Sequence, residues 1–159
     1  MADGLRHVEP GLGEAWWVVG DTYTFKVTGD DTGGGLAFFE ASVPPQGGPP
    51  PHIHGREDEF YYLLDGTLQV RDGDRLFTAE PGSFVFVPRG RLHCFRNDSH
   101  VPARVLIGIT PAGFEKFFFA VGQRAVLGQE APPLGPEEMA RSLDLAPRFG
   151  MEVQLPTEP

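Results

Sequence analysis

The sequence has one cysteine, two lysines and no long apolar run among its 159 residues. A single cysteine, Cys94, excludes a disulfide bond within the chain. No stretch approaches the roughly 20 apolar residues that cross a bilayer as a helix. The amino terminus also has no apolar segment like that of a signal peptide. These absences predict a cytoplasmic protein.

Positive charge is scarce as well, since 13 Lys and Arg against 22 Asp and Glu give a net charge of −9. Nucleic acids and anionic membranes are bound through basic surfaces, so this balance predicts that neither is a partner. A chain of this length is typical of one domain, which buries about 70% of the surface that its unfolded state exposes. We therefore expect a single domain over residues 1–159.

Two histidines and a glutamate lie close together in the stretch 50–66. Alternate side chains of a β-strand share a face, so His52 and His54 project to the same side. Glu59 follows His54 by five residues, an odd offset. A bend at Gly55-Arg56 must therefore change the phase before the carboxylate of Glu59 can face the same way.

A third histidine, His93, follows in the stretch 82–97, where an apolar strand enters a Pro-Arg-Gly turn and leaves it as a second strand. Three imidazoles and one carboxylate suit a single divalent transition metal, because these ligands are neither soft nor purely hard. Fe, Mn, Ni, Co, Cu and Zn are all candidates. The alternative is a barrel that keeps the histidine pattern and holds no metal.

Together these stretches resemble the two motifs of the cupin superfamily, G-x5-H-x-H-x3 or 4-E-x6-G and G-x5-P-x-G-x2-H-x3-N. The second motif is matched at every fixed position, by Gly82, Pro88, Gly90, His93 and Asn97. The first is matched at four positions, while Gln46 stands where its leading glycine is expected. The resemblance implies an all-β double-stranded β-helix, a cupin or jelly-roll barrel, with the metal inside it bound by His52, His54, Glu59 and His93.

Alternating apolar residues and turn signals predict strands over 15–19, 22–28, 36–43, 58–64, 67–70, 75–79, 84–87, 91–96 and 103–110. The segment 29–35 is predicted to be a turn, and Asp72-Gly73 a hairpin turn. An apolar stripe at helical spacing predicts a helix over 114–121. Pro136 begins a second helix, which should end near Leu145 before Pro147. The barrel core then spans about 15–110 and the helical segment about 113–150.

The strand around Glu59 is apolar on both faces. Glu59, Tyr61 and Leu63 should share the face of the metal, while Phe60, Tyr62 and Leu64 should face away from it. Because neither face suits water, we expect the N-terminal strands, the C-terminal segment or a second subunit to cover the outer one. A homodimer is the expected oligomer.

Several further residues have alternative interpretations. Glu59 is either a simple metal ligand or also a general base that takes a proton from a substrate hydroxyl. The expected wall of the substrate pocket is apolar, which favours a planar or aromatic ligand. It consists of Phe25, Tyr61, Leu63 and Phe95, with Phe84 or Phe86 as further candidates. His7 and His100 are expected at the surface, and Cys94, next to His93, on the opposite face of its strand.

Beyond its motifs the chain resembles single-domain bacterial cupins similar to quercetin 2,3-dioxygenase, in segments such as TPAGFEKFF after the second motif. The resemblance implies metal-dependent insertion of dioxygen into a flavonol-like aromatic molecule, with Glu59 deprotonating the substrate. Two alternatives stay open, a cupin that binds a small molecule or a metal without turnover, and a metal-dependent isomerase or decarboxylase. The barrel alone does not choose among them.

Overall fold

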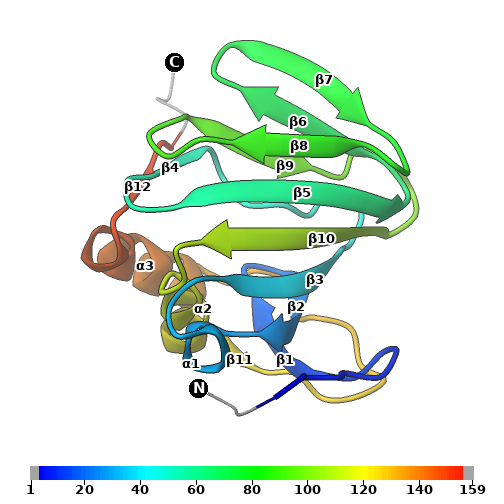
Figure 1. Cartoon of the computed structure of the whole chain (residues 1–159). Coiled ribbons are helices and arrows are strands. Elements are labelled where there is room, and N and C mark those ends of the chain that lie inside the picture. The colour runs from blue at the N-terminus through cyan, green and yellow to red at the C-terminus, as the bar shows by residue number, and fades with distance from the viewer. Residues whose placement is uncertain (1–3, 156–159) are drawn as a thin grey trace.

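The computed structural model describes residues 4–155, in which two antiparallel β-sheets face each other (Figure 1). The larger sheet has the strand order β11-β1-β2-β3-β10-β5-β8. Its strands are β1 (Glu14–Val18), β2 (Asp21–Val27), β3 (Ala37–Val43), β5 (Asp58–Asp65), β8 (Phe84–Val87), β10 (Ala103–Thr110) and β11 (Gln123–Arg124). The smaller sheet has the order β12-β4-β9-β6-β7. Its strands are β4 (His52–His54), β6 (Leu68–Asp72), β7 (Arg75–Ala79), β9 (His93–Arg96) and β12 (Met151–Val153).

The predicted all-β fold class is confirmed, and each predicted strand is present within about two residues of its expected bounds. Two local predictions were wrong. The segment 29–35 contains the one-turn helix α1 (Gly29–Thr32), whose start is fixed by a hydrogen bond from the Thr28 amide to Asp31 at 2.9 Å. The hairpin turn lies one residue later than predicted, because Asp72 pairs with Arg75 and leaves Gly73-Asp74 as the loop.

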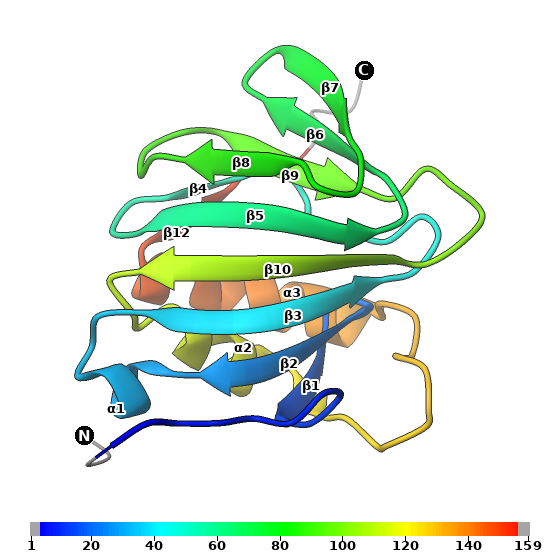
Figure 2. The ribbon, with the colours of Figure 1, turned by 45° about the vertical axis from the view of Figure 1, so that its right-hand side comes forward.

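The C-terminal part of the chain forms α2 (Glu115–Val121) and α3 (Pro136–Leu145). Both helices lie on the inner side of the larger sheet, where Figure 2 shows them behind β10, β3 and β2. Pro147 does not end the helical conformation of the chain, because the 3-10 helix η1 (Ala146–Phe149) follows α3 directly. None of the helices among residues 4–155 is long and apolar enough to cross a bilayer.

The bend predicted at Gly55 takes the chain from one sheet to the other. β4 belongs to the smaller sheet and β5 to the larger one, so the histidines of β4 face the carboxylate of β5 across the barrel. The Gly55 amide donates a hydrogen bond to the Gly150 carbonyl at 2.8 Å, and the Gly90 amide donates to the His54 carbonyl at 2.8 Å. These bonds hold the C-terminal end of the short strand β4 in place.

In the loop before β4, Gln46 occupies the position of the leading glycine of the first motif. Gln46 has a φ of 65°, in the left-handed region that glycine adopts without strain. Two residues later, Gly48 has a φ of 123°, and a Cβ there would lie 2.1 Å from the Phe95 carbonyl oxygen. No other residue fits at position 48, so the strict glycine requirement lies there.

Candidate metal centre

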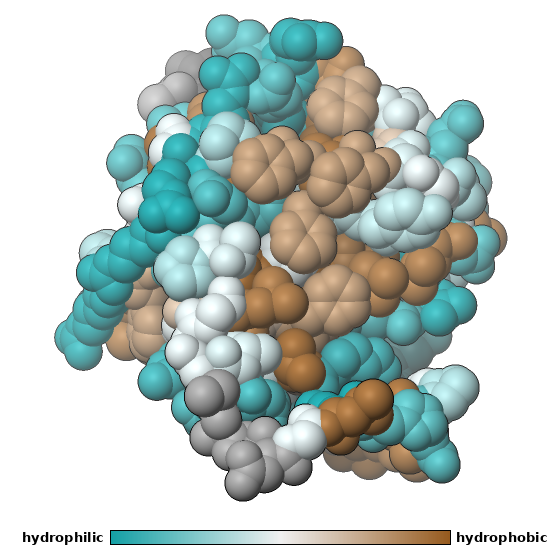
Figure 3. All heavy atoms as spheres, viewed as in Figure 1, coloured by the Kyte–Doolittle hydropathy of each residue, from teal (hydrophilic) through white to brown (hydrophobic). Residues whose placement is uncertain are grey.

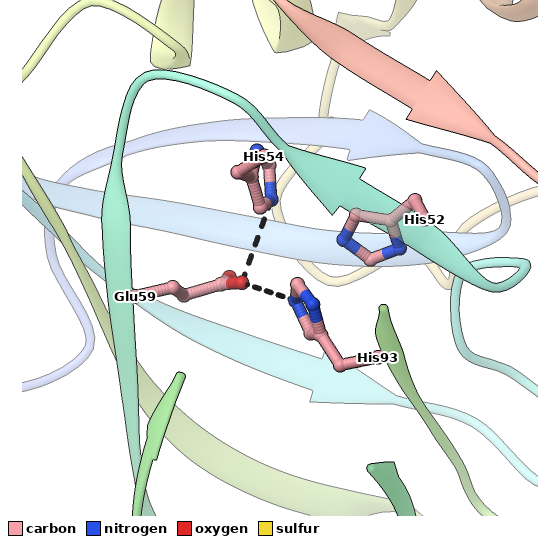
Figure 4. A group of neighbouring side chains, drawn as sticks. All are labelled: His52, His54, Glu59 and His93. Carbon is pink, nitrogen blue, oxygen red and sulfur yellow. Dashed lines mark hydrogen bonds and ion pairs between the residues drawn. The ribbon is translucent and has the colours of Figure 1, made fainter. Parts of the chain in front are cut away.

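Four side chains from three strands converge inside the barrel (Figure 4). His52 and His54 come from β4, Glu59 from β5 and His93 from β9. β4 pairs with β9 at His52 and His93, which sets these two imidazoles side by side. All four side chains are buried, and one ligand atom from each lies within 4.8 Å of the others. The structure thus brings together the four residues that the cupin resemblance implies.

Hydrogen bonds orient two of the imidazoles for metal binding. Nδ1 of His52 lies 2.8 Å from the Pro50 carbonyl oxygen, and Nδ1 of His93 lies 2.9 Å from the Arg91 carbonyl oxygen. A carbonyl accepts only, so each Nδ1 carries the proton and each Nε2 is the metal-binding nitrogen. Nε2 of His93 points to the centre, 2.8 Å from Oε2 of Glu59. This donor set fits a divalent metal ion.

The carboxylate of Glu59 lies at the middle of the group. Its Oε2 is 3.5 Å from Nε2 of His54 and accepts a hydrogen bond from the Tyr61 hydroxyl at 3.1 Å. Burial favours the protonated form of Glu59, but hydrogen bonds and positive charge from His54 and His93 outweigh it and lower its pKa. The group therefore offers an ionised carboxylate, the form that binds a cation.

Burial and nearby charges shift the pKa values of His52 and His93 in opposite directions. Burial, and then the charges of His54 and His93, lower the pKa of His52 to about 3. Burial also disfavours charge on His93, yet the hydrogen bond to Glu59 raises its pKa. The carboxylate of Glu59 therefore favours positive charge beside it. A divalent cation can supply that positive charge at the same place.

Glu57 is a buried carboxylate that sequence reasoning missed. Its Oε2 lies 3.8 Å from Nδ1 of His54, too far for a hydrogen bond, and neither atom has a partner among residues 4–155. Burial raises the pKa of Glu57. A carboxylate behind a ligating histidine fixes its tautomer and ring orientation once the two groups close to hydrogen-bond distance. Glu57 belongs to the acidic cluster at 56–59, which looks like a solvated run in the sequence.

We expect Glu57→Gln to weaken metal binding about tenfold, since loss of a carboxylate behind a ligating histidine typically lowers affinity by about 10- to 100-fold. Competition with a chromogenic chelator measures the affinity. The matched control is Glu80→Gln, at an exposed residue just after β7, which should bind metal like the native protein. Equal affinities in the two variants would show that Glu57 does not position His54.

A small cavity of about 60 Å³ lies beside the metal ligands. The barrel contributes Tyr23, Phe39, Tyr61 and Phe95, α2 contributes Phe117 and Phe118, and Phe114 lies just before α2. α3 and β12 add Met139, Ser142, Leu143, Met151 and Val153 to the wall. The ring of Phe114 lies 4.3 Å from that of His54, edge to face. The predicted helix stripe is thus part of the wall of the site.

Two of the four residues predicted for the pocket wall line the cavity, and two do not. Tyr61 and Phe95 line the cavity. Phe25 and Leu63 do not: both are buried in the packed core, where the Phe25 ring lies 4.9 Å from that of Phe39. Phe84 and Phe86 point outward and are exposed.

The remaining polar residues singled out in the sequence lie away from the cavity. His7 and His100 are exposed, and Cys94 is half-buried on the opposite face of β9 from His93. The ammonium group of Lys26 donates to the Leu12 carbonyl oxygen at 2.7 Å. No lysine or arginine of residues 4–155 lines the cavity. Its polar groups are His52, His54 and Glu59, two tyrosines and one serine.

Comparison with known proteins gives the fold a family context. Residues 39–109 match the Cupin domain family. Germin-like protein subfamily 1 member 16 of Arabidopsis thaliana is 30% identical over 128 residues, which cover 76% of this chain and 56% of that protein. The tetracenomycin polyketide synthase protein TcmJ of Streptomyces glaucescens is 38% identical over 60 residues, which cover 38% of this chain and 40% of that protein. The chain thus spans about half the length, or less, of these curated relatives.

Among solved structures, that of a predicted oxalate decarboxylase from Thermotoga maritima superposes with a TM-score of 0.59 at 18% identity, covering 64% of this chain and 94% of that one. At this identity the likeness shows the fold alone. The predicted double-stranded β-helix is confirmed, and the matches support the cupin superfamily. The narrower resemblance to quercetin 2,3-dioxygenase stays a prediction.

Proposed function

We propose that this cupin-fold chain is a metal-dependent dioxygenase that acts on a small aromatic or enolic molecule with an acidic hydroxyl group. The observation that carries the proposal is the pairing of a buried three-histidine, one-glutamate group with an apolar cavity that no lysine or arginine lines. Such a cavity selects an apolar body, while the metal group selects one ionisable oxygen. A flavonol-like molecule has both features.

The metal would be held by His52, His54, Glu59 and His93. When bound, a redox-active divalent ion supplies positive charge for a substrate oxyanion and a path for electrons to dioxygen. Zinc supplies only the charge, because it has no redox chemistry.

Glu59 is the residue proposed to move the proton. Its ionised carboxylate lies at the cavity wall, where it can accept the proton of the substrate hydroxyl and leave the substrate as an anion. Tyr61 donates its hydroxyl hydrogen to Oε2 of Glu59 and thereby holds the carboxylate in position. The phenylalanines of α2 exclude water, so that the anion forms in an environment of low dielectric constant. Both atoms of dioxygen then enter the product, and no external reductant is needed.

The size of the cavity limits the substrate. At about 60 Å³ it is less than half of the roughly 150 Å³ that holds one benzene molecule. A three-ring flavonol enters only if α2 or α3 moves. A β-diketone or a single-ring phenol requires less movement, so smaller enols and phenols are the preferred candidates.

The two alternative functions are distinguished by chemistry. An isomerase acting on a phosphorylated sugar needs positive charge for the phosphate, and no lysine or arginine among residues 4–155 supplies it in the cavity wall. A decarboxylase of this type turns over without oxygen. A cupin that only binds its ligand yields no product at all.

The test is oxygen uptake by protein loaded with Fe, Mn, Ni, Co or Cu, with acetylacetone, catechol and quercetin as substrates of increasing size. We expect uptake to fall at least about 100-fold, per bound metal ion, in Glu59→Gln, because general acid or base catalysis contributes about 10²- to 10⁴-fold. Glu130→Gln, at an exposed loop residue, is the matched control.

Full activity per bound metal ion in Glu59→Gln would rule out the proton transfer assigned to Glu59. Turnover that continues under anaerobic conditions would replace the dioxygenase with an isomerase or decarboxylase. Saturable binding of the same molecules, with no product from any loaded form, would leave a binding protein.

A further inference from the structure

The outer face of the larger sheet is apolar and open to solvent. Figure 3 shows hydrophobic side chains gathered over the middle of this face, in the same view as the strands of Figure 1. Tyr62 on β5 is 44% exposed, and Phe84 and Phe86 on β8 are 62% and 55% exposed. Among residues 4–155, neither the N-terminal strands nor the C-terminal helices cover it. The N-terminal strands, the C-terminal segment or a second subunit were expected to cover this face. Only a second subunit remains.

The strand register places the aromatic residues in adjacent rows. In one row, Phe38 on β3 is opposite Gly108 on β10, Gly108 is opposite Phe60 on β5, and Phe60 is opposite Phe86 on β8. The next row contains Leu106, Tyr62 and Phe84. The alternate residues of the same strands point into the core. The rows therefore form one continuous apolar surface across four strands.

Gly108 makes this surface flat. A Cβ at that position would lie 2.0 Å from Cζ of Phe60, so the Phe60 ring occupies the space that a side chain at position 108 would take. The Phe60 ring centre lies 6.4 Å from that of Phe38 and 6.2 Å from that of Phe84. Rings already packed against each other lose little side-chain freedom when a partner covers them.

Ion pairs border the apolar surface at both ends. At one end Arg89 and Asp58 are paired, with Nε 3.1 Å from Oδ1. At the other end Arg104 and Glu40 are paired, with Nε 2.8 Å from Oε1. An apolar centre with a polar rim is the usual anatomy of a protein interface. Each end carries one charge of each sign, so the face is complementary to itself when a two-fold axis passes through its centre.

The exposed area matches what a homodimer needs. With about 200 Å² for a large aromatic side chain, the exposed fractions of Tyr62, Phe84 and Phe86 correspond to roughly 320 Å² of apolar surface. A standard interface buries about 800 Å² per partner, a little over half of it apolar. The partly buried Phe38, Phe60 and Leu106 and the rim ion pairs supply further area.

We propose that the chain forms a homodimer in which two copies pack these outer sheet faces against each other around a two-fold axis, with Phe60, Tyr62, Phe84 and Phe86 at the centre. Sheets that pack face to face lie about 10 Å apart, so the rings of the two copies interdigitate. The interface lies on the opposite side of β5 from Glu59 and does not require a metal.

Sedimentation velocity of metal-free protein at 10 to 100 μM tests the proposal. The native chain should have twice its mass of 17.4 kDa, and the double variant Phe84→Glu, Phe86→Glu should have the mass of one chain. Both substitutions are on exposed side chains, so the fold should persist, which circular dichroism checks. The control is Leu127→Glu, at an exposed leucine just after β11, at the opposite edge of the sheet, which should stay dimeric.

A native chain that sediments as a single copy at 100 μM would overturn the proposal. So would a folded double variant that keeps the native mass, because the dimer would then use another face. Since the measurement needs neither metal nor substrate, its result is independent of the dioxygenase test.

Discussion

Replacement of His54 by alanine is expected to abolish metal binding. The native chain should retain about one metal ion after purification without a tag, and His54→Ala less than a tenth of that. His54 is one of the four residues of the group, and its Nε2 lies 3.5 Å from Oε2 of Glu59. Its loss should weaken affinity by more than the roughly 100-fold that removal of a supporting residue causes. Elemental analysis of the two proteins measures the difference.

The control for this variant is His100→Ala, which removes an exposed histidine from a turn. It should retain as much metal as the native chain. Equal metal content in the native, His54→Ala and His100→Ala proteins would mean that the metal binds elsewhere. No metal in the native chain, even after reconstitution, would remove the basis of the dioxygenase proposal.

The second large effect concerns Asp21, the first residue of β2, which is fully buried. Its Oδ2 accepts a hydrogen bond from the Tyr23 hydroxyl at 3.2 Å, while Oδ1 has no partner among residues 4–155. Burial raises the pKa of Asp21 from 3.8 to about 7, and the hydrogen bond from Tyr23 offsets only part of that rise. The folded protein thus contains a carboxyl group that prefers to be protonated.

A pKa raised on folding means that the native state binds more protons than the unfolded state between pH 4 and pH 7, so stability falls as the pH rises through this window. Below pH 4 the carboxyl is protonated in both states and has no effect. Asparagine has a similar shape and no charge. We therefore expect Asp21→Asn to remove the loss of stability between pH 4 and pH 7. Its free energy of unfolding relative to the native chain should rise by about 3 kcal/mol between pH 5 and pH 8.

Guanidinium denaturation of both proteins at pH 5 and pH 8 gives the four free energies. Asp74→Asn, at an exposed position in the β6–β7 turn, is the control. Its free energy of unfolding should equal that of the native chain at both pH values. If the free energy of unfolding of Asp21→Asn differs from that of the native chain by the same amount at pH 5 and pH 8, the carboxyl of Asp21 does not titrate in this range.

Two short-range rules predict that His52, His54 and Glu59 face one another. Alternation along β4 puts His52 and His54 on one face, and a bend at Gly55 allows Glu59 to return. The approach of His93 from 34 residues beyond Glu59 follows only from the motif resemblance, since strand pairing between β4 and β9 has no local signal. The shift of the hairpin turn to Gly73-Asp74 shows the same limit, because two adjacent dipeptides are both acceptable turns.

The pocket wall was less predictable, because alternation gives the face of a strand and not the depth of a side chain. Tyr23 and Phe25 are both buried on the inner face of β2. Tyr23 lines the cavity, whereas Phe25 packs against Phe119 of α2, with ring centres 5.0 Å apart. What separates these two residues is which side chain of α2 packs on each, Phe118 on Tyr23 and Phe119 on Phe25, and α2 lies more than 90 positions later in the chain. No pattern around β2 carries that information.

The strand β12 was not predicted, and its position restricts how a substrate can enter. β12 follows α3 and η1 directly and pairs with β4, Met151 opposite His54 and Val153 opposite His52. An outward swing of α3 about its N-terminal end would therefore pull on the strand that carries two ligands. A hinge at the other end, with the proline-containing segment 125–135 moving freely, leaves those ligands in place. Of these two motions of α3, only the second one lets a large substrate enter while the metal is retained.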